Sequence, residues 1–269
     1  MNRPPHAGIA PTPADRTVQD APPRPNELRV LWLIARRGAL ESLRDRLTLF
    51  MSLFFALALP PILVSTVVRG LVAGSAASGQ DSALGGALAI NLLTIGLLPA
   101  TGAVGVAAGQ FAGEKEQGNL APLLASPASN IAIFGGKILG SILPALLFAL
   151  VAETTYLVCL ALIIGVETLR LLPLALALTM VALVPAVALF GATVSSLISS
   201  RVRTYNAAQQ IGGLVLLPFW GLIFGLTLKL QDWGPQGSVA VVVGLFAVDL
   251  ALATLAATTW RREEVLAHR

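Results

Sequence analysis

Residues 138–165 read "ILGSILPALLFALVAETTYLVCLALIIG", and this almost uninterrupted apolar run decides the fold class. Its one charged residue is Glu153. An apolar run of more than about 18 residues is long enough to cross the hydrocarbon core of a bilayer as a helix. Because the run does not alternate between apolar and polar residues, it does not predict a strand of a membrane barrel. We therefore expect residues 131–165 to form a membrane-spanning helix.

The rest of the chain has the same character. Of its 269 residues, 55% are hydrophobic and only 12% are charged, and the mean hydropathy is +0.79. A soluble globular protein needs more polar surface than this composition provides. The sequence therefore predicts an all-α integral membrane protein with six transmembrane helices, at about residues 47–68, 84–109, 131–165, 171–198, 211–228 and 239–260.

The positions of lysine and arginine predict how these spans are oriented. Flanks and loops that an inside N-terminus places in the cytoplasm hold most of the basic residues, whereas the predicted outer loops hold only Arg69, Arg170 and Lys229. Positive residues concentrate on the cytoplasmic side of membrane proteins. We therefore expect both termini inside, and we interpret the net charge of +4 as an orientation signal and not as a sign of nucleic-acid binding.

The N-terminal region divides into a tail and a helix. Residues 1–26 contain seven prolines and no apolar run, which predicts a disordered cytoplasmic tail. From Asn26, a suitable N-cap, we expect a helix over residues 27–46. The basic residues on one broad side of this helix are Arg29, Arg36, Arg37 and Arg44.

Opposite those arginines, apolar residues such as Leu31, Trp32 and Ala35 gather on the other side of the same helix. The pattern predicts an amphipathic helix that lies in the membrane surface with its basic side towards anionic lipid headgroups. The alternative is a charged flank that only keeps the first span from sliding through the bilayer.

A charged stretch, "GEKEQGNLAPLLASPASN" at residues 113–130, separates the second and third predicted spans on the cytoplasmic side. Asn119 can cap a short helix in which Pro122 falls in the first turn, where proline is tolerated. Ser129 or Asn130 can cap the following span. The stretch predicts a short amphipathic helix over residues 120–126 that is able to press against a soluble partner, unless it is a simple loop. Its apolar face would consist of Leu120, Leu123 and Leu124.

Most catalytic and nucleotide-binding patterns are missing from the sequence. The two histidines, His6 and His268, are terminal, and no Gly-x-Ser-x-Gly stretch occurs. The stretch "GGKILGS" at residues 135–141 does not have the spacing of a phosphate-binding loop. We therefore expect a non-catalytic chain that binds no metal or other cofactor itself, so any ATP that it uses must be bound by another chain.

Two acidic residues, Glu153 and Asp249, fall inside predicted spans. Burying a charge in hydrocarbon is expensive, so each is a candidate for a polar pathway in transport. The alternative is a structural polar contact between helices. Small residues in "GAVGVAAGQ" and "GATVSS" predict close helix packing, with a glycine-lined substrate path as the other interpretation.

The charged stretch resembles the signature of ABC type-2 transporter permeases, the membrane subunits of one class of ATP-binding-cassette exporters. That family has a Glu-Arg-Glu-x-Gly-Thr-Leu-x-x-Leu-Leu-x-x-Pro run followed by Gly-Lys at the start of the third span. Asn119 stands where the family usually has Thr, and Ala121-Pro122 replaces a more polar pair. The residues that match in order are Glu114, Lys115, Glu116, Gly118, Leu120, Leu123, Leu124, Pro127, Gly136 and Lys137.

This resemblance covers nearly the whole chain after residue 26, because the basic N-terminal helix, six spans and the closing "RREEVL" are similar as well. It implies a permease domain over residues 27–269 that pairs with a second copy, or with a homologous permease, in a bacterial inner membrane. It also implies two cytoplasmic ATPase subunits that bind ATP and Mg²⁺. The residues that it assigns to ATPase coupling are Glu114, Lys115, Glu116, Gly118, Asn119, Leu120, Leu123 and Leu124.

Two other functions remain open at this point. An ion- or proton-coupled secondary transporter would use Glu153 and Asp249 in two three-helix halves, although the halves show no convincing similarity to each other. A membrane scaffold would recruit partners through the basic inner face. The spans do not select a substrate, although an apolar translocation surface favours a hydrophobic or amphipathic molecule.

Overall fold

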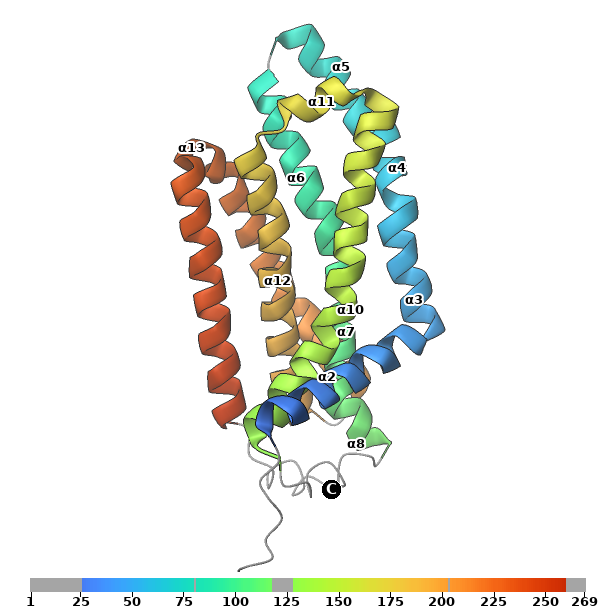
Figure 1. Ribbon diagram of the computed structural model, residues 1–269, viewed down its shortest axis with the longest axis vertical. Coiled ribbons are helices and arrows are strands. Elements are labelled where there is room, and N and C mark those ends of the chain that lie inside the picture. Colours follow the sequence, from blue (N-terminus) through green and yellow to red (C-terminus); the bar gives the residue numbers. More distant parts are fainter. Residues whose placement is uncertain (1–25, 80, 118–127, 203, 260–269) are drawn as a thin grey trace, which may run out of the picture.

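The computed structural model describes residues 26–79, 81–117, 128–202 and 204–259, and every element in these ranges is helical. Within them, six helical segments are long and apolar enough to cross a membrane, and they stand side by side in a bundle (Figure 1). These segments are Arg46–Ala77, Ala83–Glu116, Asn130–Ile164, Leu174–Arg201, Tyr205–Leu230 and Asp232–Thr258. The chain is therefore an all-α, multi-pass membrane protein, as its composition predicted.

Several spans are built from more than one helical element, because short π-helical stretches (η) interrupt the α-helices. In chain order the elements are α2 (Glu27–Arg44), α3 (Arg46–Leu53), η1 (Phe54–Ala58), α4 (Leu59–Leu63), η2 (Val64–Val68), α5 (Arg69–Ser78), α6 (Asp81–Ala100), α7 (Gly102–Ala108), η3 (Gly109–Gly113), α8 (Glu114–Glu116), α10 (Asn130–Cys159), η4 (Leu160–Ile164), α11 (Val166–Leu171), α12 (Leu174–Arg201) and α13 (Tyr205–Thr259).

Helix starts follow the capping chemistry that the sequence predicts. The Asn26 side chain accepts a hydrogen bond from Leu28 N (3.2 Å), and the Ser129 hydroxyl accepts one from Ala132 N (3.1 Å). The Asn26 cap is thus confirmed, and of the two caps predicted for the third span, Ser129 and Asn130, it is Ser129 that caps the helix. The Ser129 hydroxyl also donates to the carboxylate of Glu27, so the starts of α2 and α10 are joined.

The helix predicted over residues 27–46 ends at Arg44, because Asp45 leaves the helical conformation with ψ at 113°. The Asp45 carboxylate caps α3 by accepting hydrogen bonds from the Thr48 hydroxyl (2.5 Å) and Thr48 N (2.9 Å). These bonds, the hydroxyl first, lower the pKa of Asp45 below its usual value. Asp45 is therefore a charged corner at which the chain turns from α2 into the first span.

Regions predicted as outer turns are more helical than expected. Residues 69–78 form α5 and residues 166–171 form α11, while the first half of α13 runs up to Gly234 and its second half begins directly after it. The helices break at glycines with positive φ: Gly79 (67°), Gly165 (131°) and Gly234 (67°). Loss of hydropathy marks the edge of the membrane, but backbone hydrogen bonds carry a helix on until a residue leaves helical torsion angles.

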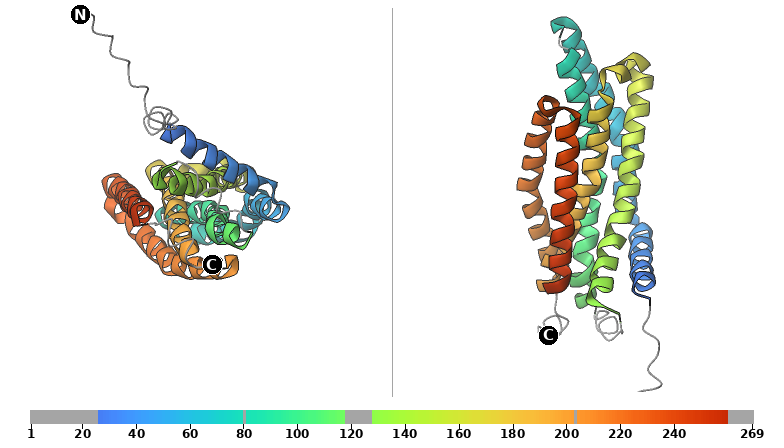
Figure 2. Two further views of the ribbon diagram at one scale, coloured as in Figure 1. Left: turned by 90° about the horizontal axis from the view of Figure 1, so that it is seen from below. Right: turned by 60° about the vertical axis from the view of Figure 1, so that its left-hand side comes forward.

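Gly234 turns α13 back on itself, so its two halves stand beside each other as the fifth and sixth spans (Figures 1 and 2). The core lies between α6, α10 and α12, which pack against one another. On α6, Leu88, Leu92 and Leu93 are fully buried there. The second half of α13 lies at the edge of the bundle and exposes most of its apolar side chains, as a helix in contact with lipid does.

One end of the bundle is crossed by α2, which lies against α10 instead of standing parallel to the spans (Figures 1 and 2). Two glycines of α10 permit this contact. A Cβ atom on Gly136 would lie 2.8 Å from Leu31 O, and one on Gly140 would lie 2.9 Å from Ala35 O. We call this the α2 end of the bundle; it also contains α8, the end of α12 and the start of α13 (Figure 1).

Gly140→Ala tests the contact between α2 and α10. Because the added methyl would press on the backbone of α2, we expect the variant to lose about 1–3 kcal/mol of stability. Gly221 in α13 is the matched control, since a Cβ there meets no atom within 4 Å. Gly221→Ala should leave stability unchanged or raise it by up to about 1 kcal/mol, because alanine favours a helix. Thermal unfolding in detergent measures both, and equal effects would contradict the contact.

Candidate functional site

The charged triplet Glu114, Lys115 and Glu116 forms α8, and its three side chains reach three different spans. Glu114 Oε2 lies 2.5 Å from Lys137 Nζ on α10. Lys115 Nζ donates to Ser200 O (2.6 Å) and Val202 O (3.4 Å) at the end of α12. Glu116 Oε1 accepts from Tyr205 N (3.1 Å) at the start of α13. We call these three side chains and their partners the α8 cluster.

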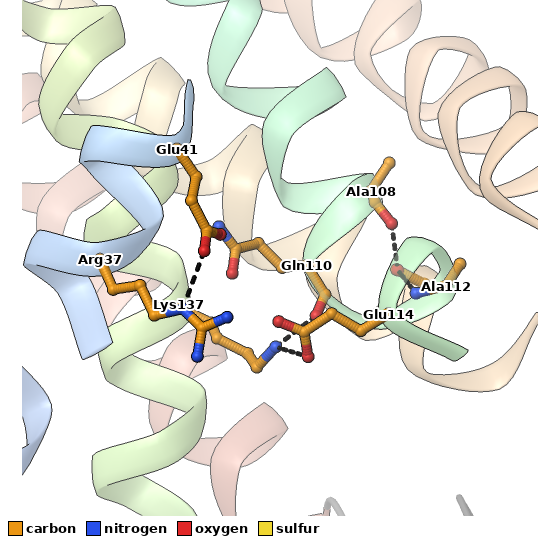
Figure 3. Close-up of polar contacts among 8 residues, drawn as sticks. Arg37, Glu41, Ala108, Gln110, Ala112, Glu114 and Lys137 are labelled. Carbon is orange, nitrogen blue, oxygen red and sulfur yellow. Dashed lines mark hydrogen bonds and ion pairs between the residues drawn. The ribbon is translucent and has the colours of Figure 1, made fainter. Parts of the chain in front are cut away.

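Lys137 is the most enclosed charge of this cluster, with 1% of its side chain exposed. Besides the Glu114 carboxylate, its ammonium group donates to Gln110 O (Figure 3). The same group lies 4.7 Å from the centre of the Phe111 ring, within range of a cation–π interaction. A buried ammonium group needs such partners, because the charged form is costly away from water.

Lys115 and Glu116 complement the ends of the helices that they contact. The last carbonyl groups of a helix have no partner within it and carry partial negative charge, which suits the ammonium group of Lys115. The first N–H groups of a helix carry partial positive charge, which suits the carboxylate of Glu116. Thr204 supplies a second cap at the start of α13, since Ala207 N donates to its hydroxyl (3.3 Å). The α8 cluster therefore binds α12 at its C-terminal end and α13 at its N-terminal end.

Arg37 and Glu41 bring α2 up to the same cluster. Arg37 Nε donates to Glu41 Oε1 at 2.8 Å, and both side chains are mostly exposed (Figure 3). This hydrogen bond, followed by the charge of Glu41, raises the already high pKa of Arg37, so the guanidinium is always charged. Arg37 and Glu41 share a small cavity of about 190 Å³ with Gln110, Glu114 and Lys137.

Two serines of α12, Ser195 and Ser199, join α12 to the second span just before α8. The Ser199 hydroxyl donates to Ala108 O (2.5 Å) and accepts from Ala112 N (2.8 Å), so it bridges the wide turn of η3. Ser195 donates to Val104 O at 2.8 Å, one helical turn away. Sequence reasoning treated Ser195 as one of several small residues, suited to close packing or to a glycine-lined substrate path, and did not consider Ser199. The four-residue spacing of the serines was the available signal, because it places both hydroxyls on one helix face.

A larger cavity of about 700 Å³ opens beside the α8 cluster. Its walls come from α2 and α3, from α7 and η3 in the second span, and from the start of α13. Glu114 lines both this cavity and the small one that it shares with Lys137. The cluster therefore lies between a space large enough for a small molecule and the contacts that hold the spans together.

The predicted coupling residues are only partly described by the structure. Glu114, Lys115 and Glu116 lie in the α8 cluster, whereas Gly118, Asn119, Leu120, Leu123 and Leu124 lie outside the described residues. The described triplet thus flanks the stretch to which the sequence assigned the coupling helix. Its side chains contact the chain's own spans, which sequence reasoning did not anticipate.

All four predicted arginines of the surface helix, Arg29, Arg36, Arg37 and Arg44, are exposed on α2. The apolar side is arranged differently from the expectation. The residues of α2 that are buried against its neighbours are Ala35, Gly38 and Ser42, whereas Trp32 remains 55% exposed. Small residues face α10 because the two helices approach closely, which leaves Trp32 directed away from that contact.

Glu153 and Asp249 are buried as expected, with 4% and 1% exposure. Glu153 packs beside Gly96 of α6, where a Cβ atom would collide with its carboxyl group. Among the described residues, neither acid forms an ion pair, and Glu153 Oε1 and both carboxyl oxygens of Asp249 have no hydrogen-bond partner. The contacts of these acids are separate from those of the α8 cluster.

Comparison with known proteins adds one finding. The family model described as "ABC-2 type transporter" matches residues 29–232, which run from α2 to the turn in α13. No curated protein sequence matches the chain.

Lys137→Met and Glu114→Gln test the ion pair of the α8 cluster. Lys137→Met leaves the Glu114 carboxylate without its cation, and because Glu114 is partly exposed we expect a loss of about 2–3 kcal/mol, below that of a fully buried pair. The double variant should lose clearly less than the sum of the two single variants, with a coupling of about 1–2 kcal/mol. Unfolding of the four proteins measures this cycle, and additive losses would exclude a direct interaction.

Ser199→Ala tests the bridge across η3. The change removes both hydrogen bonds and leaves Ala112 N without its acceptor, so we expect a loss of about 1–3 kcal/mol. Ser200→Ala is the matched control, because the Ser200 hydroxyl donates only to Leu197 O of its own helix (2.8 Å). Hydrogen exchange should accelerate at residues 109–113 in the first variant alone, and unchanged exchange there would contradict the bridge.

Proposed function

The chain belongs to the ABC-2 type transporter family, and from this premise we propose that it is the permease subunit of an ATP-driven exporter. Two ATPase subunits supplied by other chains would bind ATP and Mg²⁺. The permease itself would be non-catalytic and would form the translocation path together with a second copy or a homologous permease. A bacterial inner membrane is the proposed location.

The α8 cluster is the observation that carries this proposal. Residues 118–127, which contain the proposed coupling helix, connect α8 to the Ser129 cap of α10. A displacement of this segment would act on Glu114, Lys115 and Glu116, and through them on α10, α12 and α13. Three spans would therefore respond together to one push from an ATPase.

The contact between α2 and α10 supports a second point of action. Since Gly136 and Gly140 allow the backbones to approach closely, α2 and the start of α10 would move as one unit. We propose that α2 lies in the cytoplasmic membrane surface, with Arg29, Arg36 and Arg44 towards headgroups and the ATPase. A tilt of α2 would then tilt the third span.

Charge distribution supports the cytoplasmic placement of this end. The α2 end holds Arg29, Arg36, Arg37 and Arg44 on α2 and Arg201 at the end of α12. The opposite end, near α5 and α11, holds only Arg69 and Arg170 among the lysines and arginines of those two helices. The excess of basic residues at the α2 end is that of a cytoplasmic side.

Leu123→Asp combined with Leu124→Asp tests the proposed coupling helix. Aspartate on its apolar face would prevent docking against a soluble partner, since docking would bury unpaired charges. We expect the ATPase subunits to be lost when the tagged permease is purified from its native membranes, with the thermal unfolding of the permease unchanged. Gln117→Asp, next to α8, is the control. It also adds an aspartate at this end of the chain, but outside the proposed apolar face, and it should retain the partners.

Glu116→Gln tests transmission separately from docking. Because the coupling segment is intact, the ATPases should still copurify, but the weaker contact to Tyr205 N should lower permease-dependent ATP hydrolysis several-fold. Retained ATPases in the double leucine variant, or the absence of any ATPase from the unmodified preparation, would refute the proposed function.

A further inference from the structure

The chemistry of the 700 Å³ cavity separates into two ends. Towards the α2 end its lining includes the carboxylates of Glu41, Asp45 and Glu114, which come from α2, the α2–α3 corner and α8. Among the described residues that line it there is no lysine or arginine. Towards the middle of the bundle its lining includes Met51, Phe55, Leu98 and Pro99. A ligand of matching polarity would have a positive end and an apolar body.

Two serine side chains of this lining have no hydrogen-bond partner among the described residues. Ser42 on α2 and Ser52 on α3 are 9% and 8% exposed and both line the cavity. Neither hydroxyl makes a hydrogen bond to another residue that the structure describes, although serine hydroxyls in helices commonly bond to the preceding turn. Both hydroxyls reach the open space of the cavity, where they can bond to water or to a polar atom of a ligand.

The negative charge of the acidic end is only partly compensated. Glu41 and Glu114 pair with Arg37 and Lys137, respectively. Asp45 pairs with no cation among the described residues; its carboxylate accepts hydrogen bonds from Thr48, and these bonds lower its pKa. The three carboxylates and two bases leave one negative charge in excess, and both bases lie on the wall of the small cavity instead of the large one.

The apolar end adjoins a second cavity. This cavity, of about 290 Å³, shares Thr101, Gly105 and Gln209 with the first. Its further lining is apolar and includes Leu216, Leu217 and Trp220. The indole N–H of Trp220 is buried without a hydrogen-bond partner among the described residues, and its ring offers an apolar surface to a ligand.

From this arrangement we propose that the cavity is a binding site for amphipathic organic cations, and that such cations are the substrates of the transporter. The charged group would lie near Asp45 with the Ser42 and Ser52 hydroxyls beside its polar atoms, and the apolar body would extend towards Leu98 and Trp220. This inference about substrate class rests on the proposed function as a permease. The existence of the binding site does not rest on that function.

Two probe ions of nearly equal size and shape separate charge from hydrophobicity. Tetraphenylphosphonium carries a positive charge and tetraphenylborate a negative one, and both are apolar. We expect saturable binding of tetraphenylphosphonium to the full-length chain in lipid nanodiscs, measured against empty nanodiscs. Tetraphenylborate should show only the non-saturable uptake of the lipid, because the acidic end repels it. Equal saturable binding of both ions, or none of either, would overturn the proposal.

Gly102→Leu tests whether the binding occurs in this cavity. Gly102 lines it, and a Cβ atom there meets nothing within 4 Å, so a leucine side chain begins in open space and takes up room that a ligand would use. Leucine is preferable to an aromatic residue, which would itself attract a cation. Binding of tetraphenylphosphonium should weaken at least tenfold. Gly225→Leu is the control, because Gly225 is equally open but lies outside the cavity lining, and it should bind as the unmodified chain does.

Asp45→Asn tests the role of charge. Asparagine is as good an N-cap as aspartate, so α3 should keep its start while the cavity loses its unpaired carboxylate. We expect affinity for tetraphenylphosphonium to fall roughly fivefold, as for the loss of one solvent-accessible ion pair. Unchanged binding in Gly102→Leu or in Asp45→Asn would overturn the proposed site or its charge selectivity, respectively. These measurements need no ATPase. The proposed cation site can therefore be refuted while ATPase association is observed, and ATPase association can be refuted while cation binding is observed.

Discussion

The α2 end depends on one electrostatic constraint: Lys137 is buried in the wall of an apolar bundle and must keep its charge compensated. Glu114 and the carbonyl group of Gln110 provide that compensation, and both belong to the end of the second span. Removing a charge from water is expensive unless partners are held in place. The second span therefore cannot move away from α10 without exposing Lys137 to an uncompensated environment, and this requirement fixes the position of α8.

The other contacts of the α8 cluster extend this constraint to the rest of the bundle. Once α8 is fixed, Lys115 contacts the partially negative end of α12, and Glu116 contacts the partially positive start of α13. Ser199 ties α12 to the wide turn of η3, and Gly140 allows α2 to rest on α10. The α2 end is thus joined by polar bonds and close backbone contact, whereas the second half of α13 relies on contacts that lipid can replace.

Local chemistry in the sequence was sufficient for some features and insufficient for others. Apolar runs predicted the six spans, and capping rules predicted Asn26 and narrowed the cap of the third span to Ser129 or Asn130, because both features depend only on neighbouring residues. The motif identified Glu114 and Lys137 but not their ion pair, since a contact across 23 residues depends on how α10 packs. The wide turn of η3 and the sharp break at Gly234 between the two halves of α13 leave no trace in hydropathy, because backbone hydrogen bonds and torsion angles set them.

Glu114 has a position that connects the two proposals. Its carboxylate neutralises Lys137 on one side and lines the large cavity on the other, so a cation in the cavity and the ammonium group of Lys137 would share one acid. Occupancy of the cavity would then alter the strength of the contact that holds the second span to α10. By linkage, a displacement of residues 118–127 that strains this contact would alter the affinity of the cavity for a cation by the same factor. A single shared carboxylate would thus couple the proposed cation binding to movement of the proposed coupling segment.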